Sequence, residues 1–358
     1  MKSWLKILCI LLLVYVAVFS FLQPMGAGGL GISTITLHPG RNEFTFTGYG
    51  THFLTEQKSL QVFVASDTSA YYCADILQVV NDANVVVSVY LPDTLSSNQF
   101  AFFANDHSDG TVLVEPPVGN DGFVFVPGTK NTVCKPEIQN ADQGGHHFPF
   151  QPIIIESIRN LMWHVPMWFT MFFLMIMSFI LSLRVLNKSG RMNSGDSHAS
   201  GFASVHDLDL KAAATASTGV LFCTLGLITG SVWARFAWGA WWTNDPQLNG
   251  ALVVFMVYVA YFILRKSTPD EEKRARISAI FNIFAFVLMV VLLMVMPRFT
   301  EGLHPGKSGN PAFSQYDLDS SLRMVFYPAC LGFILLGYWL YNVNYRIKKI
   351  EIEHEENV

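Results

Sequence analysis

Charged residues are scarce in this chain. Asp, Glu, Lys and Arg together make up 14% of its 358 residues, whereas apolar residues make up 51%, and the mean hydropathy is +0.34. Soluble domains usually carry about 25% charged residues. The composition is therefore too apolar for a soluble protein of this length and indicates a membrane protein. We expect no nucleic-acid partner.

Asp, Glu, Lys, Arg and His are absent from six long apolar runs of the sequence. Each run approaches the ~20 residues that cross a bilayer. The runs are Ile7–Leu22, Val165–Leu183, Ala212–Trp233, Leu248–Leu264, Ile277–Met296 and Met324–Leu340. Proton-coupled transporters and pumps need ionisable groups at this depth, so such a function is disfavoured. The sequence predicts an all-α polytopic membrane protein with six transmembrane helices.

Positive charges lie in every second connection between these runs. They precede the first run, separate the second from the third and the fourth from the fifth, and follow the sixth. The positive-inside rule places these segments and both chain ends in the cytoplasm. We expect a bacterial inner (cytoplasmic) membrane protein whose first helix is retained. A cleaved signal peptide, with Gly26–Gly28 as the cleavage region, is the alternative.

Residues 23–151 are expected to form an inserted extracytoplasmic all-β domain, a sandwich or barrel, with its linker. Turn-forming residues separate short β-rich runs, as in small antiparallel folds. The runs are Leu60–Ala65, Val85–Leu91, Phe100–Ala104, Thr111–Val114 and Phe123–Pro127. Poor alternation at Val85–Val87 suggests strands buried on both faces. The other expected domains are a first helix over 1–22, a five-helix membrane domain over 152–343 and a charged cytoplasmic tail over 344–358.

Cysteine is also scarce, with five residues and no CxxC pair. Cys9, Cys223 and Cys330 lie in apolar runs and are expected to be small buried hydrophobes. Cys73 and Cys134 are the two cysteines of the outside segment, and an oxidising compartment would allow them to pair. We expect a structural disulfide, since a redox role has no motif to support it.

Three of the eight tryptophans fall in one short stretch between two apolar runs, Trp238 to Asp245. Such a cluster of flat amphipathic rings favours a platform for a flat apolar ligand. His164 and His304 flank other runs on the same expected face. Each histidine alone is best explained as an interfacial residue that caps a helix end. Together with the tryptophans they favour bis-histidine ligation of a haem iron.

The stretch Gly230–Leu248 resembles the tryptophan-rich WWD signature of haem-handling proteins, and most closely that of the CcmC-type cytochrome c maturation family. Met162–Pro166 and Leu303–Pro305 resemble that family's two histidine motifs. The resemblance covers the first run and about Glu156 to Asn342. It implies that haem b is held by two axial histidines at the outer membrane face. It also implies transfer to a membrane-tethered haem chaperone of the maturation protein E type, with other cytochrome c maturation membrane subunits as partners.

Residue roles follow from these observations. His164 and His304 would be the axial ligands of the haem iron, and Trp238, Trp241 and Trp242 the platform for the porphyrin. Arg235 would pair with the haem propionates; Arg159 and Arg298 are weaker candidates, better explained as interfacial charges. Asp245 would orient the loop or bind the chaperone's histidine, or it would only cap the next helix.

Two departures from the family pattern stand out. Asn244 replaces a family tryptophan, and the large β domain has no counterpart or assigned role. We expect no catalytic residues and no enzymatic activity, since the chemistry would belong to haem and its acceptor. The alternatives are a membrane-anchored receptor or scaffold that uses the β domain, or a haem exporter. An exporter would need a polar path through the spans, which the apolar runs do not offer.

Overall fold

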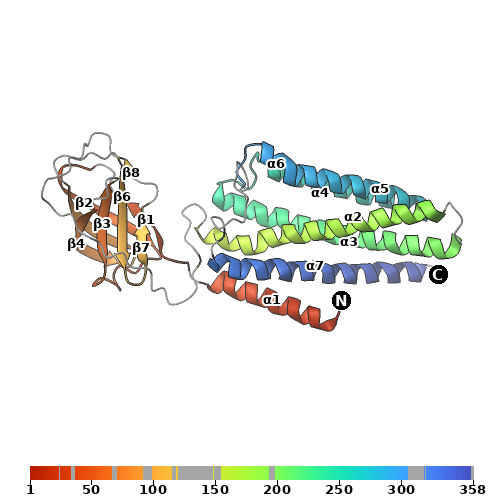
Figure 1. The fold of residues 1–358 in the computed structure, drawn as a ribbon, viewed down its shortest axis with the longest axis horizontal. Helices are drawn as coiled ribbons and strands as arrows, with labels where there is room; N and C mark the ends of the chain where they lie inside the picture. The colour runs from red at the N-terminus through yellow and green to blue at the C-terminus, as the bar shows by residue number, and fades with distance from the viewer. Residues whose placement is uncertain are drawn as a thin grey trace. The chain divides into compact units, whose positions relative to one another are not determined.

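The chain folds into two compact units. The computed structural model describes residues 1–23, 25–33, 37–66, 71–91, 99–114, 118–119, 148, 155–192, 198–304, 318 and 320–355. One unit, called here the membrane unit, comprises Met1–Leu22 and Ser157–Val358. The other, the β unit, comprises Gln23–Glu156 (Figure 1).

Among the described residues of the membrane unit, six helical segments are long and apolar enough to cross a membrane, as the sequence predicts. The helices are α1 (Ser3–Leu22), α2 (Leu161–Met192), α3 (His198–Ala237), α4 (Pro246–Lys266), α5 (Glu271–Val290) and α7 (Ser320–Glu355). A short 3-10 helix, η1 (Ile155–Asn160), precedes α2. Several helices extend well past the apolar runs, because a helix can continue into polar sequence where its side chains reach water or an ionic partner.

The fifth span changes its helical type before it ends. After α5, a π-helical segment, η2 (Val291–Val295), leads into the short α6 (Met296–Phe299). Pro297 accounts for the change, because proline has no N–H to donate and its ring clashes with the carbonyl four residues earlier. A wider π turn, in which Met296 N donates to Val291 O, accommodates this. The span thereby continues to Phe299 and leads directly into the Thr300–His304 segment.

Helix α2 lies at the centre of the bundle and contacts α3, α5 and α7, while α1 packs along α7 (Figure 1). Glycines on α3 allow the close approach of α2. A Cβ on Gly226 would lie 2.9 Å from the Trp168 ring, and a Cβ on Gly230 would lie 2.7 Å from Cε1 of His164. Small residues permit such approach in membrane helices. The α2–α3 contact therefore fixes where His164 lies.

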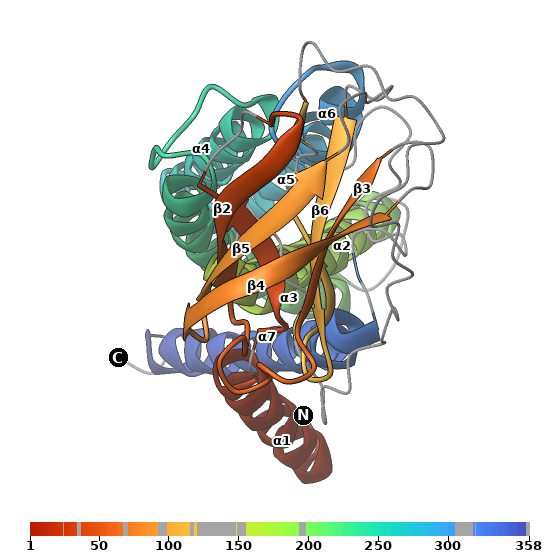
Figure 2. The same ribbon diagram turned by 90° about the vertical axis from the view of Figure 1, so that its left-hand side faces the viewer.

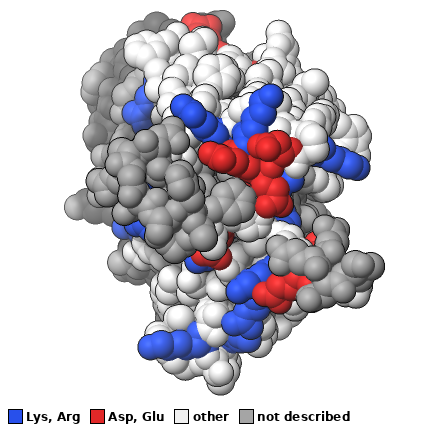
Figure 3. All heavy atoms as spheres, turned by 90° about the vertical axis from the view of Figure 1, so that its right-hand side faces the viewer, with Lys and Arg blue, Asp and Glu red and all other residues white. Residues whose placement is uncertain are grey.

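Ion pairs occupy the end of the membrane unit where α2 joins α3 and α4 joins α5. Figure 3 shows acidic and basic side chains gathered on this face. Arg265 of α4 donates two hydrogen bonds to Asp209 of α3, at 2.6 and 2.8 Å, and both side chains are largely buried. Lys211 pairs with Asp207 at 2.7 Å, and Asp207 also accepts from Tyr345 of α7. Asp209 and Asp207 thereby join α3 to α4 and to α7.

The β unit is an antiparallel, barrel-like sheet, which confirms the all-β prediction (Figure 2). The strand order is β1-β2-β5-β4-β3-β6-β7, and β8 pairs with β6. The strands are β1 (Gly28–Ile32), β2 (Gly40–Tyr49), β3 (Gln61–Ser66), β4 (Tyr71–Asn81), β5 (Asn84–Leu91), β6 (Gln99–Asp106), β7 (Gly110–Leu113) and β8 (Val118–Gly119). Four predicted runs correspond to β3, β5, β6 and β7. The fifth, Phe123–Pro127, lies outside the described residues.

Strand β5 corrects one expectation about burial. Val85, Val87 and Val89 are fully buried in the core, but Val86 is only half-buried and Tyr90 is 46% exposed. The other face is mixed, because Ser88 on it is buried as well. The expectation that such strands are buried on both faces therefore holds for one face and only in part for the other, since an apolar residue such as Val86 is common on a partly exposed sheet face.

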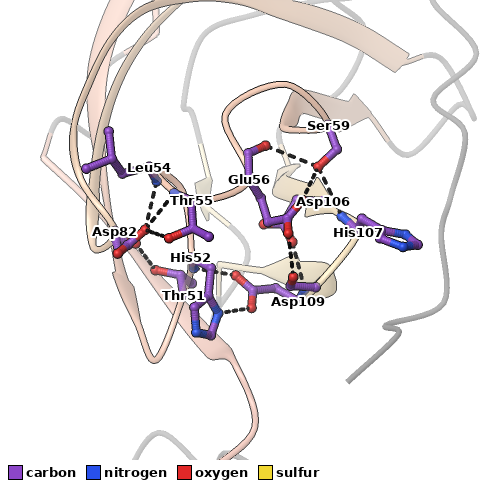
Figure 4. Close-up of polar contacts among 11 residues, drawn as sticks. Thr51, His52, Leu54, Thr55, Glu56, Ser59, Asp82, Asp106, His107 and Asp109 are labelled. Carbon is purple, nitrogen blue, oxygen red and sulfur yellow. Dashed lines mark hydrogen bonds and ion pairs between the residues drawn. The ribbon is translucent and has the colours of Figure 1, made fainter. Parts of the chain in front are cut away.

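A polar cluster fastens the loop after β2 to the β6–β7 hairpin (Figure 4). Nδ1 and the backbone N of His52 each lie 2.7 Å from a carboxylate oxygen of Asp109, and Asp109 N donates to the carboxyl of Asp106 at 2.7 Å. Asp82 accepts from the backbone N of Leu54 and of Thr55. Burial and the neighbouring Asp109 raise the pKa of Asp106 to about 6, and the hydrogen bond to Asp109 raises the pKa of His52.

We predict that acid stabilises the β unit over the range in which these two groups titrate. A raised folded-state pKa means that the folded state binds the proton more tightly, so the gain is present at low pH and lost as the pH rises. The stability that Asp106 contributes is lost between pH 3.8, its ordinary pKa, and about pH 6, its pKa in the folded unit. The stability that His52 contributes is lost above its ordinary pKa of 6.5. The pKa values of Glu56 and Asp82 are lowered, so their opposing contribution is lost only in stronger acid.

Urea unfolding of residues 23–156 between pH 4.5 and 8 measures this dependence. The urea midpoint should fall as the pH rises, and Asp106→Asn should flatten the part below about pH 6. A midpoint that rises across this range would contradict the prediction.

The described residues include one of the two cysteines of the predicted disulfide. Cys73 is disulfide-bonded, whereas Cys9, Cys223 and Cys330 are free thiols. Cys134 lies outside the described residues, so the pairing with Cys73 stays a prediction. Closing a loop of about 60 residues should stabilise the unit by a few kcal/mol, ~4 in the chain-entropy model. Thiol labelling of the denatured, unreduced segment 23–156 should find no free thiol; two free thiols would disprove the bridge.

Candidate functional site

The tryptophan loop, Trp238–Asp245, connects α3 to α4 and has no helical or strand structure, as expected. It begins where Trp238 N donates to Ala234 O at the end of α3. Gly239 then adopts a φ of +76°, a backbone conformation open to glycine. The guanidinium of Arg235 closes the turn by donating to Gly239 O at 2.8 Å. Arg235, predicted to pair with propionates, therefore also supports the shape of the loop.

The indole rings of the tryptophan loop are unequally exposed. Trp241 is 60% exposed and Trp242 is 39% exposed, whereas Trp238 is half-buried against His304. Nε1 of Trp242 donates to Asn249 Oδ1 at 3.2 Å, and Asn249 Nδ2 donates to Asn244 Oδ1 at 2.8 Å. Asn244 thus replaces an aromatic ring with an amide that holds Trp242 through Asn249. The role of Asn249 was not predicted from the sequence.

Asp245 is the most connected residue of the site. Its carboxylate is 1% exposed and caps α4 by accepting from Gln247 N at 2.9 Å and Leu248 N at 3.2 Å. The same carboxylate accepts from Leu303 N at 2.7 Å and lies 2.9 Å from His304 Nδ1. The two readings of Asp245, as a helix cap and as an orienting group, therefore both hold. It ties the start of α4 to the segment that follows α6.

The environment of Asp245 determines which ring nitrogen of His304 carries a hydrogen. Burial opposes ionisation, but the Leu303 amide, the charge of His304 and the α4 amides together hold the pKa of Asp245 below its usual value. An ionised carboxylate only accepts, so Nδ1 of His304 carries a hydrogen. The ring also packs against Trp238, with centroids 5.1 Å apart in an edge-to-face contact. Nε2 is then the nitrogen with which this ring could bind a metal.

His164 lies in the first turn of α2 and is buried, with 9% of its surface exposed. Its Nδ1 is 3.0 Å from Thr229 Oγ1 of α3. The Thr229 hydroxyl also lies 2.9 Å from Leu225 O and 3.2 Å from Gly226 O. With its hydrogen donated to either carbonyl, the oxygen is left to accept from Nδ1 of His164. The ring contacts Trp168 and Trp233 edge to face. Thr229 could not be identified from the sequence, since 65 residues separate it from His164.

The structure gathers most of the predicted site residues at one end of the membrane unit. His164 lies against the last turns of α3, which lead into the tryptophan loop, and Asp245 joins that loop to His304. Arg159 is separate: it donates to Ser20 O at 2.8 Å and so fastens η1 to the end of α1.

Asp245→Ala should destabilise the membrane unit more than the loss of a helix cap explains. Asp270 provides the matched control, because it caps α5 by accepting from Lys273 N. Asp270→Ala should cost about 1 kcal/mol. Asp245→Ala should cost about 1–3 kcal/mol more, because it leaves the Leu303 amide and the His304 ring without their acceptor. Unfolding in mixed micelles measures both; equal losses would show that only the cap matters.

Comparison with known proteins connects this end of the unit to a family. Residues 146–304 match the family described as Cytochrome C assembly protein. The chain is 28% identical over 131 residues to Heme exporter protein C of Paracoccus denitrificans, which covers 37% of the chain and 54% of that protein. It is 28% identical over 141 residues to Heme exporter protein C of Haemophilus influenzae, covering 38% of the chain and 55% of that protein.

The chain also matches Cytochrome c biogenesis protein CcsA of Prochlorococcus marinus strain MIT 9303 over a shorter stretch. The two are 40% identical over 97 residues, which covers 27% of the chain and 30% of that protein. The chain thus spans about half, or less, of the curated relatives it matches. The matched residues contain α2 to α6, the tryptophan loop and both histidines. The membrane-spanning part of this chain is therefore similar to cytochrome c assembly proteins, and among them to Heme exporter protein C.

Proposed function

We propose that this protein handles haem in cytochrome c biogenesis, by binding haem b through Nε2 of His164 and Nε2 of His304. The observation that carries the proposal is that both histidine rings make their hydrogen bond through the same ring nitrogen, Nδ1. Each is held at one end of the membrane unit through Nδ1, and each bears its hydrogen there. Neutral imidazoles fixed in this way are prepared to bind a metal through the other nitrogen. The relatives' names support haem as the cargo.

The residues around the two rings suit a flat, apolar, carboxylate-bearing cargo. Trp241 presents most of its indole surface, which can pack against a porphyrin. Arg235 is exposed beside the loop, and its guanidinium can pair with a propionate. His164 is buried, so binding there requires the rings of Trp168 and Trp233, which pack against it, to move aside.

We further propose that the protein passes its haem to a membrane-tethered haem chaperone of the maturation protein E type, with other cytochrome c maturation membrane subunits. The site and the β unit would face the outside of a bacterial inner membrane, with both chain ends in the cytoplasm. The alternation of positive charge supports this orientation. The chain would bind and deliver haem and catalyse no bond formation itself. We assign no role to the β unit.

Optical spectroscopy of the purified protein in detergent tests haem binding directly. Haem added to the wild type should give a Soret band and a low-spin, six-coordinate spectrum. His164→Ala or His304→Ala should each weaken haem retention and change the coordination spectrum, because each removes one axial nitrogen. His206→Ala, at the other end of α3, is the control and should behave as the wild type.

Trp241→Ala should reduce haem binding while leaving the spectrum of the remaining haem recognisable. Trp4→Ala is the matched control, since Trp4 is 59% exposed and Trp241 is 60% exposed. A protein that gains no Soret band on titration would remove the haem proposal and leave the receptor or scaffold function as the leading one. An unaltered spectrum in both histidine variants would show that the ligands are other residues.

A further inference from the structure

The two hydrogen bonds that hold the histidine rings use acceptors of different chemistry. Nδ1 of His304 faces the carboxylate of Asp245, which is also fixed by three backbone amides. Nδ1 of His164 faces the hydroxyl oxygen of Thr229. A carboxylate acceptor draws the hydrogen of an imidazole toward itself and makes the opposite nitrogen more basic. A neutral hydroxyl oxygen does so far less.

We propose that the two axial ligands are unequal, with His304 the strong ligand and His164 the weaker one, and that Thr229 is the positioning residue for His164. This inference rests on the proposed binding of haem by the two histidines. It assigns Asp245 the corresponding role toward His304. A haem-delivery protein must release its cargo, and a weaker bond on one side of the iron gives release a defined first step.

Thr229 is well placed to position the His164 ring. Its hydroxyl is held by the Leu225 carbonyl one turn earlier, so the oxygen presents a fixed lone pair to Nδ1. Asn160 Nδ2 donates to Thr229 O at 2.9 Å and joins this turn of α3 to the start of α2. Gly230 leaves the space in which the ring lies. The acceptor thus selects the tautomer with hydrogen on Nδ1, which leaves the Nε2 lone pair for iron.

The backbone of Gly226 is a second partner of the His164 ring, and it stays in place when Thr229 is replaced. Loss of the hydroxyl should therefore weaken the site without abolishing it. The expected increase in the rate of haem loss is several-fold, toward the lower limit of the ~10–100-fold seen when a ligand loses its supporting partner.

Resonance Raman spectroscopy of the ferrous, haem-loaded protein tests the inequality. His164→Ala leaves His304 as the single protein ligand, and His304→Ala leaves His164. The iron–histidine stretching frequency should be higher in His164→Ala, because a carboxylate-supported imidazole binds iron more strongly. Adding Asp245→Asn to His164→Ala should lower the frequency toward that of His304→Ala. Equal frequencies, or the reverse order, would overturn the proposal.

Haem transfer to excess apomyoglobin tests Thr229. Thr229→Val keeps the volume of the side chain and removes the acceptor, so haem should be lost several-fold faster and part of the spectrum should become high-spin. Thr229→Ser should restore the wild-type rate. Thr224→Val is the matched control, because Thr224 makes the same backbone hydrogen bond, to Val220 O, on the same helix. Thr229→Val behaviour equal to that of Thr224→Val would remove the assignment.

These outcomes separate the two levels of inference. If the wild type binds no haem, or if neither histidine variant changes its spectrum, the proposed function fails. If the wild type shows a bis-histidine spectrum but the Raman frequencies and the Thr229 variants show no difference, only the inequality of the ligands fails.

Discussion

The carboxylate of Asp245 accepts hydrogen bonds from the first turn of α4, from the backbone of Leu303 and from the ring of His304. It does so while almost fully buried. A buried carboxylate is tolerated only when its lone pairs are satisfied, so these donors and the charge they surround depend on each other. Through it the tryptophan loop, the start of α4 and the segment after α6 form one rigid assembly. The position of His304, which lies in no helix, follows from this interaction.

His164 is positioned by a different kind of force. It lies in a helix, and its place is set by the close approach of α2 to the glycine face of α3. Packing in the membrane depends on such small residues, since lipid offers no hydrophobic drive for helices to associate. The buried ion pair of Arg265 with Asp209 lies at the other end of α3. Paired charges join the helices at that end, whereas at the site the Asp245 carboxylate accepts from backbone amides and faces an imidazole.

Much of this arrangement could be predicted from the sequence, and the reasons are local. The six spans follow from uninterrupted apolar runs, and the tryptophan loop follows from its composition. The site could be predicted only as a set of residue types on one face. Thr229 and Asn249 were missed because their roles depend on which helix turns meet, and a threonine or an asparagine carries no signal of its own. The partial exposure of one β5 face was missed because three successive valines hide the alternation of buried and exposed positions.

The π-helical segment before Pro297 has a consequence for direction. A π turn accommodates one residue more than an α turn, so everything beyond it is rotated by about 100° relative to an uninterrupted helix. The chain that emerges after Phe299 leads to His304, and its heading is set by that added residue. The number of residues in Val291–Val295 therefore sets the direction in which the chain leaves α6 toward His304. A single deletion in this stretch would turn the chain that leads to His304 and oppose the contact with Asp245 that holds the ring.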